Sequence, residues 1–147
     1  MIDAAYAIQK AYVALLAGIT YAGVAVPVYY EYAPDGEEAD NFIVFGSITD
    51  NDQSSMNTQD SILNISVTIH TRKDRDNDGK AVAMIASEVL QRCYPASGVQ
   101  IDLSADDMQV HSTKKTNDFT QSWSVNNQKV YIDRTIQFSH NIYYLNS

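Results

Sequence analysis

The sequence predicts one α+β domain of 147 residues, with a single, mostly antiparallel sheet and two helices packed on one of its faces. Two segments carry apolar residues at helical spacing, and one segment between them alternates apolar and polar residues as a half-buried strand does. Apolar residues make up 45% of the chain, which is enough for a core. No linker or internal repeat divides the sequence, so residues 1–147 are expected to fold as one two-layer domain.

The first expected helix covers residues 3–18, where Asp3 can cap the N-terminus and Gly18 ends the helix. The second covers residues 78–93 and stops before Pro95. Each has an apolar stripe: Ala5, Ile8, Tyr12, Leu15 and Leu16 in the first helix, and Val82, Ile85, Ala86, Val89, Leu90 and Cys93 in the second.

Three strands are expected between the helices. Residues 26–32 predict an edge strand because Pro27 lies near its start. Residues 42–48 are apolar on both faces, which indicates a central strand. Residues 63–70 alternate strictly and indicate a half-buried antiparallel strand. Polar loops are expected at residues 34–41 and 50–60.

The last third is expected to contain three further strands. Residues 99–103 predict a short one, and Met108 and Val110 begin the next. Residues 111–129 are polar and predict a long loop. The final strand, residues 135–145, places alternating residues on one face: Ile136, Phe138, His140, Ile142 and Tyr144.

Charge is unevenly distributed along the chain. Eighteen acidic and ten basic residues give a net charge of −8, which argues against binding nucleic acid by neutralising phosphates. Residues 11–71 contain no Lys or Arg, and we expect this base-free segment to place its negative charge on one face. A face that only keeps the domain soluble is the simpler alternative. The eight acids of the segment are Glu31, Asp35, Glu37, Glu38, Asp40, Asp50, Asp52 and Asp60.

Residues 74–79, Asp-Arg-Asp-Asn-Asp-Gly, form the most specific local motif in the sequence. Asp74, Asp76 and Asp78 have the spacing of the first ligands of an EF-hand loop, so a small calcium-dependent binding module is one alternative. The twelfth position should be Glu but is Ile85, within the expected helical stripe. The other interpretation is a strand-to-helix turn whose Asp side chains cap the helix.

No residues have the spacing of a catalytic site. The three histidines, His70, His111 and His140, match no metal-binding pattern, and hydrogen-bonded structural roles are expected for His70 and His140. Cys93 lies in an apolar stripe and does not have the surroundings of a nucleophile. We therefore expect no enzyme, no catalytic residue, no metal and no cofactor, and a small hydrolase ranks last among the alternatives.

Aromatic residues are frequent, with ten tyrosines in the chain. Tyr and Trp are favoured at interfaces because they bury a large area and keep a polar group. Phe119 and Trp123 stand in an otherwise polar segment, where an isolated domain has little reason to keep them. We expect Phe119, Trp123, Tyr143 and Tyr144 to contact other subunits or partners. Shielding of the sheet is the simpler alternative for the tyrosines.

Five segments along most of the chain follow one another in a characteristic order. They are the Ala-rich first helix ending at Leu16-Ala17-Gly18, the segment VPVYYEYAPDG at residues 26–36, Asn41-Phe42-Ile43-Val44-Phe45-Gly46, the strand ending at Ile69-His70-Thr71-Arg72, and the helix ending at Val89-Leu90. By their order and spacing these structural motifs resemble the tail-completion, or tail-terminator, family of tailed phages. Asn41 stands where the family has Pro.

The resemblance implies a structural virion protein. It implies a homo-oligomeric, hexameric ring that caps the tail tube and joins it to the neck or connector on the head side, without catalysis or a cofactor. DNA would pass through the ring without specific binding. We hypothesise that Glu37, Glu38, Asp50 and Asp52 line the lumen, because carboxylates do not hold phosphates. Another neck or head-closure ring of the same particle is the nearest alternative.

The N-terminal segment has no basic stretch before its apolar residues, and no apolar run reaches the roughly 18 residues of a membrane span. We therefore expect no signal peptide and no membrane contact. Assembly in the host cytoplasm and a place in the tail or neck of the virion follow as expectations. The single cysteine excludes a disulfide within the chain.

Overall fold

A computed structural model describes residues 3–54, 60–74, 79–94, 100–125 and 129–145. Its main sheet has five strands in the order β3-β4-β5-β7-β6, and every neighbouring pair is antiparallel except β3 and β4. This architecture confirms the predicted α+β class with one mostly antiparallel sheet. The strands are β3 (Val28–Tyr30), β4 (Asn41–Asp52), β5 (Asp60–Asp74), β6 (Met108–Val125) and β7 (Lys129–Tyr144), and a separate hairpin pairs β1 (Thr20–Tyr21) with β2 (Val24–Ala25).

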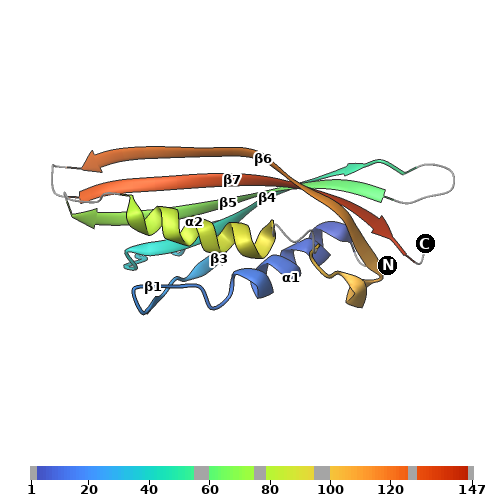
Figure 1. The fold of residues 1–147 in the computed structure, drawn as a ribbon, viewed down its shortest axis with the longest axis horizontal. Helices are drawn as coiled ribbons and strands as arrows, with labels where there is room; N and C mark the ends of the chain where they lie inside the picture. Colours follow the sequence, from blue (N-terminus) through green and yellow to red (C-terminus); the bar gives the residue numbers. More distant parts are fainter. Residues whose placement is uncertain (1–2, 55–59, 75–78, 95–99, 126–128, 146–147) are drawn as a thin grey trace.

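The helices α1 (Ala4–Leu16) and α2 (Lys80–Cys93) lie along one side of the sheet (Figure 1), which is the predicted arrangement. Asp3 caps α1, and its carboxylate accepts a hydrogen bond from the Ala5 N–H at 3.2 Å. The N-cap residue of α2 is Gly79, whose φ of 78° favours glycine. Arg92, in the last turn of α2, donates to the carbonyls of Leu15 and Ala17 at 2.9 and 2.7 Å, which joins the ends of the two helices. Within the described ranges, neither helix is long and apolar enough to cross a membrane.

The core lies between the helices and the face of the sheet that they cover, here called the inner face. The alternation predicted for β5 and β7 is confirmed, because alternate residues of both strands are buried there. The Tyr12 ring of α1 lies 5.9 Å from the Phe45 ring and 6.5 Å from the Phe138 ring, centroid to centroid. The buried inner-face residues are Ile43 and Phe45 of β4, Leu63, Ile65, Val67 and Ile69 of β5, and Ile132, Ile136, Phe138, His140 and Ile142 of β7.

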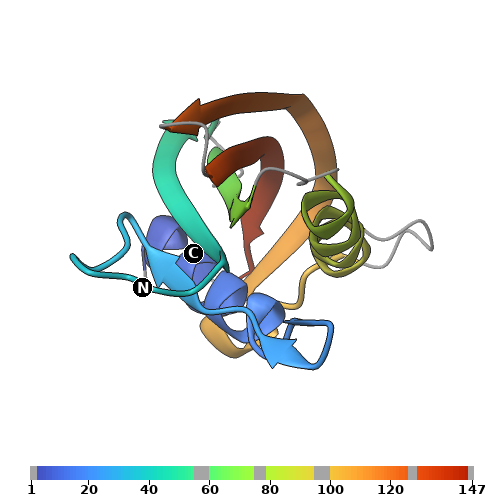
Figure 2. The same ribbon diagram turned by 90° about the vertical axis from the view of Figure 1, so that its left-hand side faces the viewer.

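The edge strands and the loops beside them agree only in part with the prediction. Val28–Tyr30 forms the predicted edge strand after Pro27, and β4 lies between β3 and β5, as its apolar residues predicted. β4 continues to Asp52, so part of the expected 50–60 loop is strand. The long loop expected over residues 111–129 is wrong, because β6 extends without interruption to Val125. Seen along the strands, the sheet curves strongly (Figure 2).

The short strand predicted over residues 99–103 is also wrong. Ile101 and Leu103 are buried but lie in an irregular segment that leads into a single 3-10 turn, Ser104–Asp106. Their apolar alternation serves to close one end of the core and not to pair with a strand. Val99 lies outside the described residues.

Candidate functional site

Much of the face of the sheet opposite the helices, here called the outer face, is not covered by any described element of this chain. On its β3 side the segment before β4 lies against it, since Glu37 and Ala39 accept hydrogen bonds from the outer-face residues Tyr29 and Arg72. Its central rows on β5 and β7 carry small polar side chains that face each other across the strands: Asn64 and Ser139, Ser66 and Gln137, and Thr68 and Thr135. The hydroxyls of Thr68 and Thr135 lie 3.1 Å apart and hydrogen bond across the two strands. The outer face is therefore polar and uncharged at its centre.

Aromatic rings gather on the outer face at the end where β5 and β6 finish. Phe42 and His70 stack with centroids 4.8 Å apart, and Trp123 and Tyr131 stack with centroids 5.6 Å apart and ring planes 11° from parallel. These four residues, here called the aromatic cluster, line a hollow of about 70 Å³. Thr71, Arg72 and Asp133 complete its lining.

Two charged residues border the aromatic cluster. His70 Nδ1 lies 3.1 Å from Asp133 Oδ2. The Arg72 guanidinium lies 5.7 Å from the centroid of the Phe42 ring and donates to the carbonyls of Ala39 and Glu37. Because these polar groups are bonded within the chain, the cluster resembles a contact surface for another protein more than a site for chemistry.

Phe119 and Trp123 lie on β6 and not in the loop that the sequence predicted. Both are on the outer face, and they are 40% and 46% exposed. On the opposite face of the same two strands, Arg134 donates to both carboxylate oxygens of Asp118 at 2.9 and 2.8 Å. The bonds from Arg134 lower the pKa of Asp118.

Tyr143 and Tyr144 lie at the other end of β7. The Tyr143 ring stacks on His111 at a centroid distance of 5.1 Å, whereas Tyr144 turns to the inner face and packs against the core. Burial raises the pKa of Tyr144. At about 3.3 Å per residue, Tyr143 lies roughly 40 Å along the strand from Tyr131. The structure therefore does not bring the four predicted interface residues into one patch.

The four predicted lumen acids also divide into two pairs. Glu37 and Glu38 precede β4, and Asp50 and Asp52 end it, which at about 3.3 Å per residue separates the pairs by roughly 30 Å. Glu38, Asp50 and Asp52 are exposed. The Glu37 carboxylate is directed to the protein, because it accepts hydrogen bonds from the Tyr29 hydroxyl and the Ala39 N–H.

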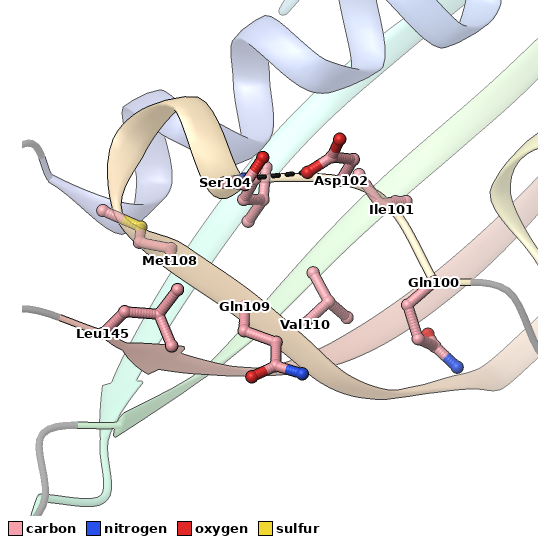
Figure 3. Close-up of a pocket in the computed structure, with 9 residues that line it drawn as sticks. Gln100, Ile101, Asp102, Ser104, Met108, Gln109, Val110 and Leu145 are labelled. Carbon is pink, nitrogen blue, oxygen red and sulfur yellow. Dashed lines mark hydrogen bonds between the residues drawn. The ribbon is translucent and has the colours of Figure 1, made fainter.

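A larger hollow of about 470 Å³ opens at the end of the molecule that contains the C-terminus (Figure 3). The segment from Gln100 to Ser104 forms one side, Met108 to Val110 the other, and Leu145 closes one end. The Asp102 carboxylate accepts a hydrogen bond from the Ser104 N–H at 2.9 Å. Hydrogen bonds from the Ser104 side chain and from its backbone N–H lower the pKa of Asp102. This carboxylate thus stabilises its own turn.

Two titratable groups that could do chemistry, His140 and Cys93, lie in the core. His140 is fully buried, and burial lowers its pKa to about 4. Burial raises the pKa of the Cys93 thiol to about 12. Among the described residues no three His, Cys, Asp or Glu side chains are grouped to hold a metal ion. Asp74 ends β5, and residues 75–78 of the calcium motif, including Asp76 and Asp78, lie outside the described residues.

Several residues of the outer face were not identified from the sequence. Phe42, His70 and Tyr131 come together only because the strand register aligns three separate strands. The alternation of residues 63–70 indicated that His70 lies on the polar face, but it did not indicate a ring partner. Structural roles for His70 and His140 agree with their contacts.

The fold defines a small α+β domain in which the helices cover one face of the sheet and much of the other face is left uncovered by the described residues. No protein-family model and no curated protein sequence matches the chain. One chain of a solved structure described as "Virion of native gene transfer agent (GTA) particle" is similar in fold, with a TM-score of 0.48 and 13% sequence identity. The similarity covers 77% of this chain and 78% of that chain. A likeness at this level does not assign a function.

Proposed function

We propose that the chain is a non-catalytic structural subunit of a phage-like virion, and specifically a tail-completion or tail-terminator protein. In this role, copies of the chain associate into a ring, of six subunits by the sequence resemblance, which caps the tail tube and contacts the neck. The ring needs no cofactor and no membrane. Glu38, Asp50 and Asp52 stay the predicted lumen acids. Glu37 is the least available of the four acids predicted for the lumen, because its carboxylate is bonded within the chain.

The observation that carries this proposal is the contrast between the core and β6. Three groups able to do acid-base or nucleophilic chemistry, His140, Cys93 and Tyr12, are buried in the core, and the partly exposed His70 is bonded to Asp133. In contrast, Phe119 and Trp123 are exposed on a strand that the described residues leave uncovered. Large exposed aromatics on a sheet are typical of surfaces that become buried in an assembly.

The experiment is negative-stain imaging of the purified chain, alone and mixed with tail tubes of the particle that contains it. We expect closed rings in one or both samples, and caps at one end of the tubes. Binding to the head-side connector without binding to tubes would favour the neck-ring alternative. A chain that forms no ring and binds neither component contradicts the proposal.

Matched substitutions show whether the predicted surface is used. Trp123→Ser should weaken ring formation and tube capping by about tenfold or more, because buried Trp residues often dominate interface energies. Met84→Ser is the control, since Met84 is 51% exposed on α2 and its substitution removes exposed apolar surface away from the outer face. Equal effects of the two substitutions would contradict a role for the outer face.

A further inference from the structure

The second half of β6 has no neighbouring element on its outer edge or on either face within the part of the chain that the structure describes. β6 ends the sheet, and within the described residues β7 is the only strand paired with it. Its first part is accompanied by the segment at Gln100, whose side-chain oxygen accepts a hydrogen bond from the Thr113 hydroxyl at 2.7 Å. From Lys114 to Ser124, in contrast, every side chain except Asp118 is exposed. This half of the strand therefore offers unpaired backbone groups to a partner.

The sequence of the second half of β6 is typical of an edge strand that pairs with a strand of another chain. Proteins protect edges that must stay single with charged residues, bulges and proline. β6 has such protection around Lys114 and Lys115, which lie next to a register shift before Asn117. Phe119–Ser124, Phe-Thr-Gln-Ser-Trp-Ser, has no charge, proline, glycine or register shift. A long uncharged edge with exposed aromatics accepts an added strand readily.

The opposite edge of the same sheet is formed by β3, which lies at the same position along the strand direction as the exposed half of β6. The strand registers align one row across all five strands, which consists of Tyr29, Val44, Thr68, Thr135 and Phe119. The pairings also make β3 antiparallel to β6 in direction. A second copy placed beside the first in the same orientation thus brings its β3 antiparallel to β6, with Val28 facing Thr120.

The charges of the two edges are complementary. Glu31 follows the last residue of β3, and its N–H donates to the Phe45 carbonyl at 2.8 Å, which completes the Tyr30–Phe45 pairing. Its φ of 73° turns the chain out of the strand at this point. Because Tyr30 is level with Asp118 on β6, the exposed Glu31 lies near the level of Asn117, two residue rows along the sheet from Lys114. Diagonal pairs at this spacing are within reach of long side chains. Lys115 already bonds Asp118 at 3.3 Å, which leaves Lys114 to meet Glu31 of a second copy.

We infer that the Lys114–Ser124 edge of β6 pairs in antiparallel fashion with the β3 edge of a second copy of this chain, so that the sheets of neighbouring subunits are continuous. The contact joins two different surfaces, and such head-to-tail contacts generate rings when the rotation closes. The inference rests on the proposed function and specifies how neighbouring subunits of the ring meet.

Cysteine cross-linking tests the pairing directly. The variants Val28→Cys and Thr120→Cys are mixed and oxidised mildly, and a disulfide-linked pair of chains is expected from the mixture but not from either variant alone. Cys93 is buried and does not interfere. A mixture of Thr120→Cys with Asp52→Cys, which places the second thiol at the far end of β4, is the control and should give no link.

Charge reversal gives a second test that does not depend on disulfide geometry. Glu31→Lys and Lys114→Glu should each weaken self-association, and the double variant should restore it. Thermal unfolding of each variant as a monomer excludes a loss of fold as the cause. Loss without restoration in the double variant contradicts the Glu31–Lys114 contact.

The outcomes separate this inference from the proposed function. Rings that form without the Val28–Thr120 link, or a Thr120→Cys variant that links to itself, overturn the edge pairing and leave the ring standing. Open filaments that contain the link support the pairing and contradict the ring. A chain that stays monomeric with and without tail components contradicts both.

Discussion

The hydroxyl of Tyr12 in α1 and Nε2 of His140 in β7 lie 2.6 Å apart in the core, although the two residues are 128 positions apart in the sequence. Nδ1 of His140 lies 2.9 Å from the Thr113 hydroxyl oxygen. That hydroxyl donates its one hydrogen to Gln100, so it accepts from the histidine Nδ1–H. Burial keeps His140 neutral, so Nε2 carries no hydrogen and accepts from the Tyr12 hydroxyl. The bonds of His140 join the first helix to the last two strands.

This arrangement predicts that the protein loses stability in mild acid. Burial lowers the pKa of His140 to about 4, while an unfolded histidine has its ordinary value near 6.5. Between these values the unfolded chain binds a proton that the folded chain does not. The stabilising contribution is therefore complete above pH 6.5 and falls with the pH, by about 3 kcal/mol once pH 4 is reached. Urea unfolding measured at several pH values across this range checks the slope.

The control for this prediction is His140→Gln, whose amide can accept from Tyr12 and donate to Thr113 but does not titrate in this range. The variant should be less stable than the wild type at pH 7 and should show a flatter dependence between pH 6.5 and 4. Identical slopes for the two proteins would show that His140 is not held neutral in the fold.

Tyr12→Phe should destabilise the protein by about 1–3 kcal/mol, because it leaves the His140 Nε2 atom buried without a donor. The aromatic packing of Tyr12 against Phe45 and Phe138 stays in place. Tyr6→Phe is the matched control, since Tyr6 lies on the same helix but is 52% exposed. Thermal or urea unfolding compares the variants, and equal stabilities would mean that the Tyr12–His140 bond contributes nothing net.

The elements predicted from the sequence are those with a clear apolar period. α1, α2, β5 and β7 each bury one stripe or one face, and that burial leaves a period of 3.6 or 2 in the sequence. β6 was expected to be a loop because its second half buries almost nothing on either face. An exposed edge strand has no apolar alternation by which it can be recognised, and its pairing with β7 is visible only in three dimensions.

The candidate surface was predicted only in part for a similar reason. Phe119 and Trp123 were identified because large aromatics are unexpected in a polar segment. Phe42 and His70 read as ordinary strand residues, and their stacking depends on the register between β4 and β5. Sequence spacing within one strand carries no information on that register, so the aromatic cluster could not be foreseen.

The Cys93 thiol should be unreactive in the folded protein. It is buried on α2, and burial raises its pKa to about 12, so almost no thiolate exists at neutral pH. Titration with a thiol reagent at pH 8 should detect less than a tenth of the cysteine in the native state and all of it in denaturant. Rapid labelling of the native protein would mean that the packing between α2 and the sheet opens readily.

Trp123 is the only tryptophan, so its fluorescence reports on the outer face alone. Its ring stacks on Tyr131 and is 46% exposed in the single chain. If subunits cover the β6 edge, raising the protein concentration should shift the emission to shorter wavelength and reduce quenching by acrylamide, since the indole leaves water. The variant Lys114→Glu should need a higher concentration for the same shift, because it lacks the charge that would meet Glu31 of the neighbouring copy. An emission spectrum that does not change while the protein associates would mean that subunits meet elsewhere and that the exposed half of β6 stays in solvent.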